Sequence, residues 1–166
     1  MKTTFAVYGP CEVPVYQGAG GRTITTDEVR VFWQSNSSVA KSKGCYVFAM
    51  RAGKGFSPYY VGKATKGFKQ EAFSPHKLTK YQQCLADYRR GTPVMFFVVA
   101  SGKKGGNTAH IGELEGFLIQ VGLTANPYLL NVKGTKAEDW GITGVLRGGK
   151  GKPSQDARQF RRLMKI

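Results

Sequence analysis

The alternation of apolar and polar positions is clearest in the middle of the chain, where it predicts three strands. The runs Cys45–Met50 and Tyr59–Val61 are rich in β-forming residues, and the segment between them is rich in Gly, Lys, Ser and Pro, as is typical of a hairpin with a loose turn. Met95–Ala100 is apolar on both faces and predicts the central strand of a small sheet. The expected fold class is therefore α+β, with a three-stranded antiparallel sheet flanked by helices.

Two tyrosines of the hairpin are expected to meet beside bare backbone. Side chains alternate along a strand, so Tyr46 and Phe48 share one face, and Tyr60 shares a face with Gly62. Because glycine has no side chain to block approach, the two phenols have room to come together there.

Apolar residues at helical spacing predict two longer helices. Ser74 is a good N-cap and Pro75 suits the first helical position, so a helix is expected to follow them. Its buried stripe is expected to consist of Leu78, Tyr81, Leu85 and Tyr88. A second helix is predicted from about Thr108 to Val121, ended by Gly122.

The second of these helices carries a carboxylate on its apolar side. Placing residues about 100° apart gathers an apolar arc that consists of Ile111, Leu114, Leu118 and Val121, with Phe117 and Ile119 beside it. Glu115 falls inside the arc, whereas Glu113 falls outside it and is expected to be solvated. An ionised carboxylate on a buried face needs a cation or several hydrogen-bond donors. Glu115 is therefore the candidate metal ligand.

The segments on either side of these elements look like extensions. In residues 1–43 we expect a strand at Phe5–Tyr8, stopped by Gly9-Pro10. We also expect a short helix through Val29–Gln34, capped by residues 25–28, with Trp33 in the core. Residues 132–166 are basic and Gly-rich.

A short terminal helix is predicted in that basic segment, at Asp156–Lys165. Its apolar side chains are expected to dock on the body of the protein, namely Phe160, Leu163 and Met164. Trp140 is open to two interpretations, a core residue or a stacking platform.

Composition is that of one globular domain spanning residues 1–166. No apolar run is long enough to span a membrane and the N-terminus lacks the apolar core of a signal peptide, so we expect a cytoplasmic protein without a membrane partner. The 3 cysteines form no CxxC pair and are expected to be reduced packing residues. The 25 basic and 10 acidic residues give a net charge of +15, which favours nucleic acid as the partner.

Two short motifs carry a family resemblance. Gly44-Cys45-Tyr46 and Tyr60-Val61-Gly62 resemble the two halves of the signature of the GIY-YIG family of DNA endonucleases. The family continues with a helix, a strand, a helix with a metal-binding glutamate, and an asparagine after a proline-containing turn. Glu115 and Asn131 follow in that order, so the resemblance covers about residues 44–131, which we expect to form the nuclease core.

The resemblance implies how phosphodiester bonds would be hydrolysed. One divalent metal, Mg²⁺ or Mn²⁺, would be held by Glu115, and Tyr46 would act as the general base. Because a free tyrosine has a pKa near ~10, Tyr46 needs nearby positive charge, for which Lys63 is well placed. Tyr60 would position the phosphate or the water, and Asn131 would fix the site by hydrogen bonds.

One position departs from the family. Most members place an arginine in the helix after the second motif, followed one turn later by a histidine, and Glu71 stands where that arginine is expected. His76 remains as a phosphate-side or proton-transfer group, and Lys69 or Lys77 would have to replace the missing cation. Glu71 itself is either a second carboxylate near the metal or a salt-bridge partner of a lysine.

Several basic side chains outside the motifs are candidates for contacts with DNA or RNA phosphates. They are Lys77, Lys80, Arg89, Arg90, Arg158, Arg161 and Arg162. For the lysines and arginines of the helix after Ser74, a merely solvated face is the alternative. For the whole chain, the alternatives to a nuclease are a nucleic-acid-binding protein of the same fold without catalysis, and a basic RNA-associated protein with coincidental motifs.

Overall fold

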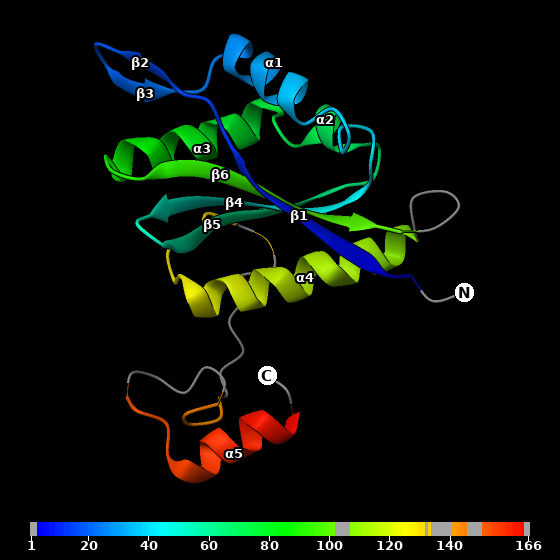
Figure 1. Cartoon of the computed structure of the whole chain (residues 1–166), viewed down its shortest axis with the longest axis vertical. Helices are drawn as coiled ribbons and strands as arrows, with labels where there is room; N and C mark the ends of the chain where they lie inside the picture. Colours follow the sequence, from blue (N-terminus) through cyan, green and yellow to red (C-terminus); the bar gives the residue numbers. More distant parts are fainter. Residues whose placement is uncertain (1–2, 102–106, 132, 134–140, 146–150, 165–166) are drawn as a thin grey trace. The chain divides into compact units, whose positions relative to one another are not determined.

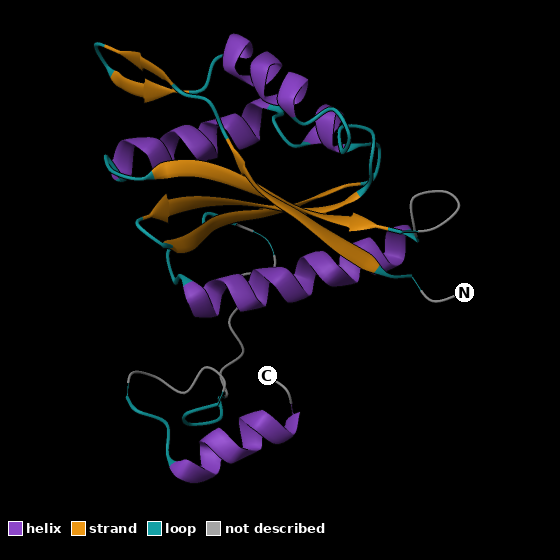
Figure 2. Cartoon of the chain, viewed as in Figure 1, coloured by secondary structure: helices purple, strands orange, loops and turns teal. Residues whose placement is uncertain are grey.

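The computed structural model describes residues 3–101, 107–131, 133, 141–145 and 151–164. The chain separates into two units, Met1–Gly134 and Thr135–Ile166, and each is described here by itself. Trp140 lies outside the described residues. The fold is of the α+β class (Figures 1 and 2). That the whole chain is one domain stays a prediction.

A four-stranded antiparallel sheet forms the centre of the first unit, in the order β1-β6-β4-β5. Its strands are β1 (Phe5–Glu12), β4 (Gly44–Ala52), β5 (Gly55–Ala64) and β6 (Thr92–Ala100). The prediction of three strands is wrong, because β1 joins the sheet along β6. Gly9-Pro10 does not stop this strand but lies within it, next to a shift of register between Tyr8 and Cys11. The missing N–H of a proline is tolerated on an edge strand, and β1 is one.

The predicted hairpin forms with longer strands and a tighter turn than expected. Only Gly53 and Lys54 separate β4 from β5, so the predicted loose turn is wrong. Pro58 lies inside β5, which is the other edge of the sheet and tolerates it for the same reason. The prediction that Met95–Ala100 is a central strand is confirmed, because β6 lies between β1 and β4.

The N-terminal segment also holds a small hairpin that the hydrophobic pattern did not predict. It consists of β2 (Tyr16–Gly18) and β3 (Gly21–Thr23), and it leads into α1 (Thr26–Ser35). The predicted helix start is confirmed, since Thr25 and Glu28 form a capping box. Phe32 and Trp33 are buried, as expected for Trp33.

Helices lie on both faces of the sheet (Figure 1). One face carries α1 together with α2 (Phe68–Glu71) and α3 (Pro75–Asp87), and its core includes Tyr46, Phe48 and Phe97. The other face carries α4 (Thr108–Ala125), where Cys45 packs against Ile111. Alternating side chains of β4 therefore feed two separate cores.

Helix α4 differs from its prediction at its end and in its buried stripe. It continues past Gly122 to Ala125, and Gly122 instead gives room to Leu129 and Val61. Phe117 and Val121 are exposed, because α4 packs on the sheet along one side only. None of the described helices has the length and apolar character that crossing a membrane needs.

The second unit is described around α5 (Gln155–Met164), which matches the predicted terminal helix closely. Ser154 caps the helix by accepting a hydrogen bond from the backbone N–H of Ala157, and Ala157 is buried against Gly144. Phe160 and the last two residues of the helix are exposed. The docking of this helix on the body of the protein stays a prediction.

Candidate functional site

The two tyrosines of the hairpin meet as the sequence predicts. Tyr46 on β4 pairs across the strands with Gly62 on β5, and a Cβ atom at Gly62 would overlap the Tyr46 phenol. The centroids of the Tyr46 and Tyr60 rings are 6.4 Å apart. Only glycine at position 62 leaves room for this arrangement.

Tyr46 is sealed from solvent. Its side chain is fully buried, and its hydroxyl has no hydrogen-bond partner among the described residues. Burial raises the pKa of Tyr46 well above its ordinary value, and the neighbouring phenols of Tyr81 and Tyr60 add to this effect. The phenol is therefore protonated at neutral pH in this structure.

Lys77 supplies a positive charge beside Tyr46. Its Nζ lies 5.1 Å from the centre of the Tyr46 ring and donates a hydrogen bond of 2.7 Å to the backbone oxygen of Glu71. Burial lowers the pKa of Lys77, whereas the carboxylates of Glu71 and Glu115 raise it. Of the two lysines expected to replace the missing arginine, Lys77 and not the exposed Lys69 reaches the tyrosines.

Lys77, predicted to contact nucleic acid, has a side chain that is only 9% exposed, and that role stays a prediction. It stands one helical turn before Tyr81, which is fully buried, so both point to the same side of α3.

Glu115 forms an ion pair with Lys63. Its Oε2 lies 3.0 Å from Lys63 Nζ, with side-chain exposures of 24% for Glu115 and 45% for Lys63. The cation that a carboxylate on this face of α4 needs is thus supplied by β5. Glu113 is exposed, in agreement with its predicted role as a solvated neighbour.

These two groups of residues approach each other around the edge strand β5. Tyr60 faces α3, whereas Lys63 follows Gly62 and faces α4, because side chains alternate. The Glu115 carboxylate nevertheless acts across the strand, since after burial it is the next cause that raises the pKa of Tyr60. The candidate site is therefore the outer edge of β5 near Gly62.

Asn131 covers part of that edge. Its side-chain amide donates to the backbone oxygen of Val61 at 2.7 Å and accepts from the backbone N–H of Val61 at 2.9 Å. Leu130 donates its N–H to Tyr59, and Lys80 Nζ donates to the Leu130 oxygen at 2.8 Å. These hydrogen bonds are those of a structural bridge, and Lys80 has a structural partner.

Glu71 and His76 do not join the site in the expected ways. The Glu71 carboxylate accepts a hydrogen bond of 2.6 Å from the backbone N–H of Lys66, and none of the ion pairs among the described residues includes it. The described residues contain no group of three His, Cys, Asp or Glu side chains that would hold a metal ion. His76 is exposed, and its ring contacts the Ser74 hydroxyl at 3.3 Å.

The remaining candidates for nucleic-acid contacts are exposed. Arg89 and Arg90 come just after Tyr88, the C-cap of α3, and the α5 candidates are Arg158, Arg161 and Arg162. Their function stays a prediction.

One member of the tyrosine cluster was assigned only to the core by the sequence. The ring of Tyr81 lies 5.9 Å from that of Tyr60, and its hydroxyl donates a hydrogen bond of 2.7 Å to the backbone oxygen of Ala72. Its spacing of four residues from Lys77 was the available signal.

Comparisons of the chain with protein-family models, curated proteins and solved structures found no match. The resemblance to GIY-YIG nucleases therefore rests on the residues of the motifs.

Proposed function

We propose that this protein is a divalent-metal-dependent endonuclease that hydrolyses phosphodiester bonds in DNA. The observation that carries the proposal is the position of Glu115, a partly exposed carboxylate paired with Lys63 at the same strand edge as Tyr60 and Gly62. A carboxylate, a cation and a tyrosine gathered at one strand edge are groups that phosphodiester hydrolysis can use. A charge of +15 favours a polyanionic substrate.

The residues present are compatible with one magnesium ion. Mg²⁺ is commonly held by one or two carboxylates, with water and substrate phosphate oxygens as the other ligands. Glu115 would be the protein ligand, and the Tyr46 hydroxyl is a buried polar atom without a partner among the described residues. When bound, the metal would neutralise charge on the phosphate and favour attack by water.

The side chains of the chain itself would divide the remaining work. Lys63 would turn from Glu115 to the phosphate, because a cation that loses its carboxylate partner to a metal is free to bind an anion. Tyr60 would hold the phosphate or the attacking water. Lys77 would stabilise the tyrosinate form of Tyr46, since a positive charge lowers the pKa of a neighbouring phenol.

The test compares wild type with Glu115→Ala and with the matched variant Glu113→Ala, which removes a solvated carboxylate from the same helix. Each protein is incubated with supercoiled plasmid, with Mg²⁺ or Mn²⁺ or with chelator. We expect nicking or linearisation by wild type and Glu113→Ala only with metal, and none by Glu115→Ala. Cleavage by Glu115→Ala would overturn the assignment of the ligand.

The second candidate is a nucleic-acid-binding protein without catalysis. The burial of the Tyr46 hydroxyl favours it, because a general base must reach its proton donor. Glu71 in place of the family's arginine favours it as well. Binding of plasmid, branched DNA and RNA without cleavage of any of them would establish this candidate instead.

A further inference from the structure

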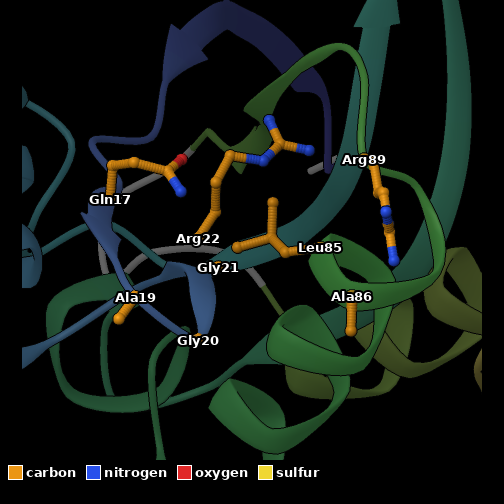
Figure 3. Close-up of a pocket in the computed structure, with 8 residues that line it drawn as sticks. All are labelled: Gln17, Ala19, Gly20, Gly21, Arg22, Leu85, Ala86 and Arg89. Atoms are coloured by element: carbon orange, nitrogen blue, oxygen red, sulfur yellow. The ribbon is translucent and has the colours of Figure 1, made fainter.

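A groove lies between the β2–β3 hairpin and the C-terminal end of α3. None of the residues that line it is among those proposed for catalysis. Its volume is about 530 Å³. Its lining residues are Gln17, Ala19, Gly20, Gly21, Arg22, Leu85, Ala86 and Arg89. Figure 3 shows Arg22, Leu85 and Arg89 among the residues that line this groove.

The groove is positively charged. Arg22 and Arg89 are its ionised side chains, and none of the described residues that line it is acidic. The nearest carboxylate along α3, Asp87, lines a different groove, with Tyr59 and Tyr128. The two arginines of the lining thus attract anions.

Arg22 is held in place and keeps donors to spare. Its guanidinium donates to the backbone oxygens of Gly91 at 2.5 Å and Tyr88 at 2.6 Å. These bonds cover carbonyl groups beyond the end of α3 that would otherwise repel an anion. A guanidinium has five N–H donors, so this arginine is positioned and still able to bind an oxyanion.

Arg89 is unpaired within the described part of the chain. Among the described residues, no hydrogen bond or ion pair engages its guanidinium. The turn of the hairpin, Ala19-Gly20, also lines the groove, and a Cβ at Gly20 would meet nothing within 4 Å. A planar, fork-shaped donor beside an open backbone turn suits a phosphate group.

We propose that this groove binds a backbone phosphate of the nucleic acid, with Arg89 as the mobile contact and Arg22 as the fixed one. The proposal rests on the proposed function for the identity of the polyanion, and it adds a second contact region outside the strand edge of β5. It assigns Arg89 a defined role rather than a share in the overall charge.

The experiment measures binding of a fluorescent 20-base-pair duplex by anisotropy, with chelator present so that cleavage does not interfere, over a range of KCl concentrations. We expect Arg89→Gln to weaken binding about fivefold to tenfold and to reduce the salt slope by about one. The control Arg30→Gln removes the same charge from α1, where Arg30 pairs with Asp27, and is expected to change affinity less than about twofold.

A second pair of variants separates charge from shape. Gly20→Glu places a carboxylate at the open turn, whereas Gly20→Gln places a neutral side chain of the same size there. Gly20→Glu should weaken duplex binding about tenfold and Gly20→Gln should not. The proposal that the groove binds phosphate would be overturned if this pair had equal affinities, or if Arg89→Gln and Arg30→Gln had equal effects. Either result would leave the nuclease proposal standing.

Inorganic phosphate tests the other source of the same chemistry. Two results together would identify a small-anion site and overturn the nucleic-acid contact. Millimolar phosphate would raise the melting temperature of wild type but not that of Arg89→Gln, and Arg89→Gln would bind the duplex as tightly as wild type. If wild type binds the duplex but does not cleave plasmid, the result would count against the proposed function alone.

Discussion

The hydroxyl of Tyr46 is expected to lower the stability of the fold and to be needed for the proposed cleavage. A buried hydroxyl without a hydrogen-bond partner costs about 1–3 kcal/mol, and the Tyr46 hydroxyl is in that position. Tyr46→Phe is therefore expected to raise the free energy of unfolding by about 1 kcal/mol. The same change should abolish cleavage if Tyr46 is the general base. Urea unfolding and the plasmid assay measure the two effects on one protein.

Tyr81→Phe is the matched control, because Tyr81 is buried in the same cluster but has a partner. Its hydroxyl donates to Ala72, and removing it would leave a buried carbonyl unpaired. We expect a loss of about 1–2 kcal/mol. If Tyr46→Phe destabilises the protein as much as Tyr81→Phe does, the Tyr46 hydroxyl has a partner in solution.

The raised pKa of Tyr46 also predicts how stability depends on pH. A folded phenol that holds its proton more tightly than the unfolded one, whose pKa is 10.0, stabilises the fold fully below that pH. This contribution is lost as the pH rises above 10. We expect the free energy of unfolding of wild type to fall more steeply above about pH 10 than that of Tyr46→Phe. Urea titrations at several alkaline pH values check this, and parallel curves would contradict it.

At the scale of elements, replacing a glycine by alanine is expected to change stability in opposite directions in a strand and in a helix. Gly62→Ala on β5 should cost about 2 kcal/mol or more, because the new methyl group collides with the Tyr46 phenol in a packed core. Gly116→Ala on α4 meets nothing within 4 Å and should stabilise by up to about 1 kcal/mol, since alanine favours helix. Thermal unfolding of both variants decides the matter. Stabilisation by Gly62→Ala would show that the tyrosine pair is loosely packed.

The elements that periodicity predicted well are those whose local signals agreed with their burial. Helix α1 has its capping box, and α3 starts at Pro75 after Ser74, as expected. The errors arose where tertiary contacts overrode a local signal. A Gly-Pro pair ordinarily ends a strand, but β1 continues through it because an edge position needs no N–H there.

The candidate site was predictable only in part, for a similar reason. The alternation rule gave the meeting of Tyr46 and Gly62, and the helical arc gave Glu115. Neither rule says which cation lies near which anion across elements. The pairing of Lys63 with Glu115 and the burial of Lys77 beside Tyr46 depend on how α3 and α4 pack around β5.

At the scale of the whole molecule, the excess of basic residues makes the few carboxylates informative. With 10 acidic and 25 basic residues, one carboxylate at a proposed phosphate site opposes substrate binding unless a metal is present. Glu115 also engages Lys63, a cation that would otherwise contact phosphate. Without metal, then, Glu115 should weaken the binding of nucleic acid.

Glu115→Gln and Glu113→Gln test this, because each removes one negative charge from α4. In chelator, Glu115→Gln is expected to bind duplex DNA several-fold more tightly than wild type, since it frees Lys63 and removes repulsion at the strand edge. Glu113→Gln, at an exposed position, should change affinity by less than about twofold. Adding Lys63→Met to Glu115→Gln should cancel the gain, because the freed cation is then absent. If the two single variants bind equally, the effect is one of net charge, and the strand edge of β5 near Gly62 is not where the phosphate lies.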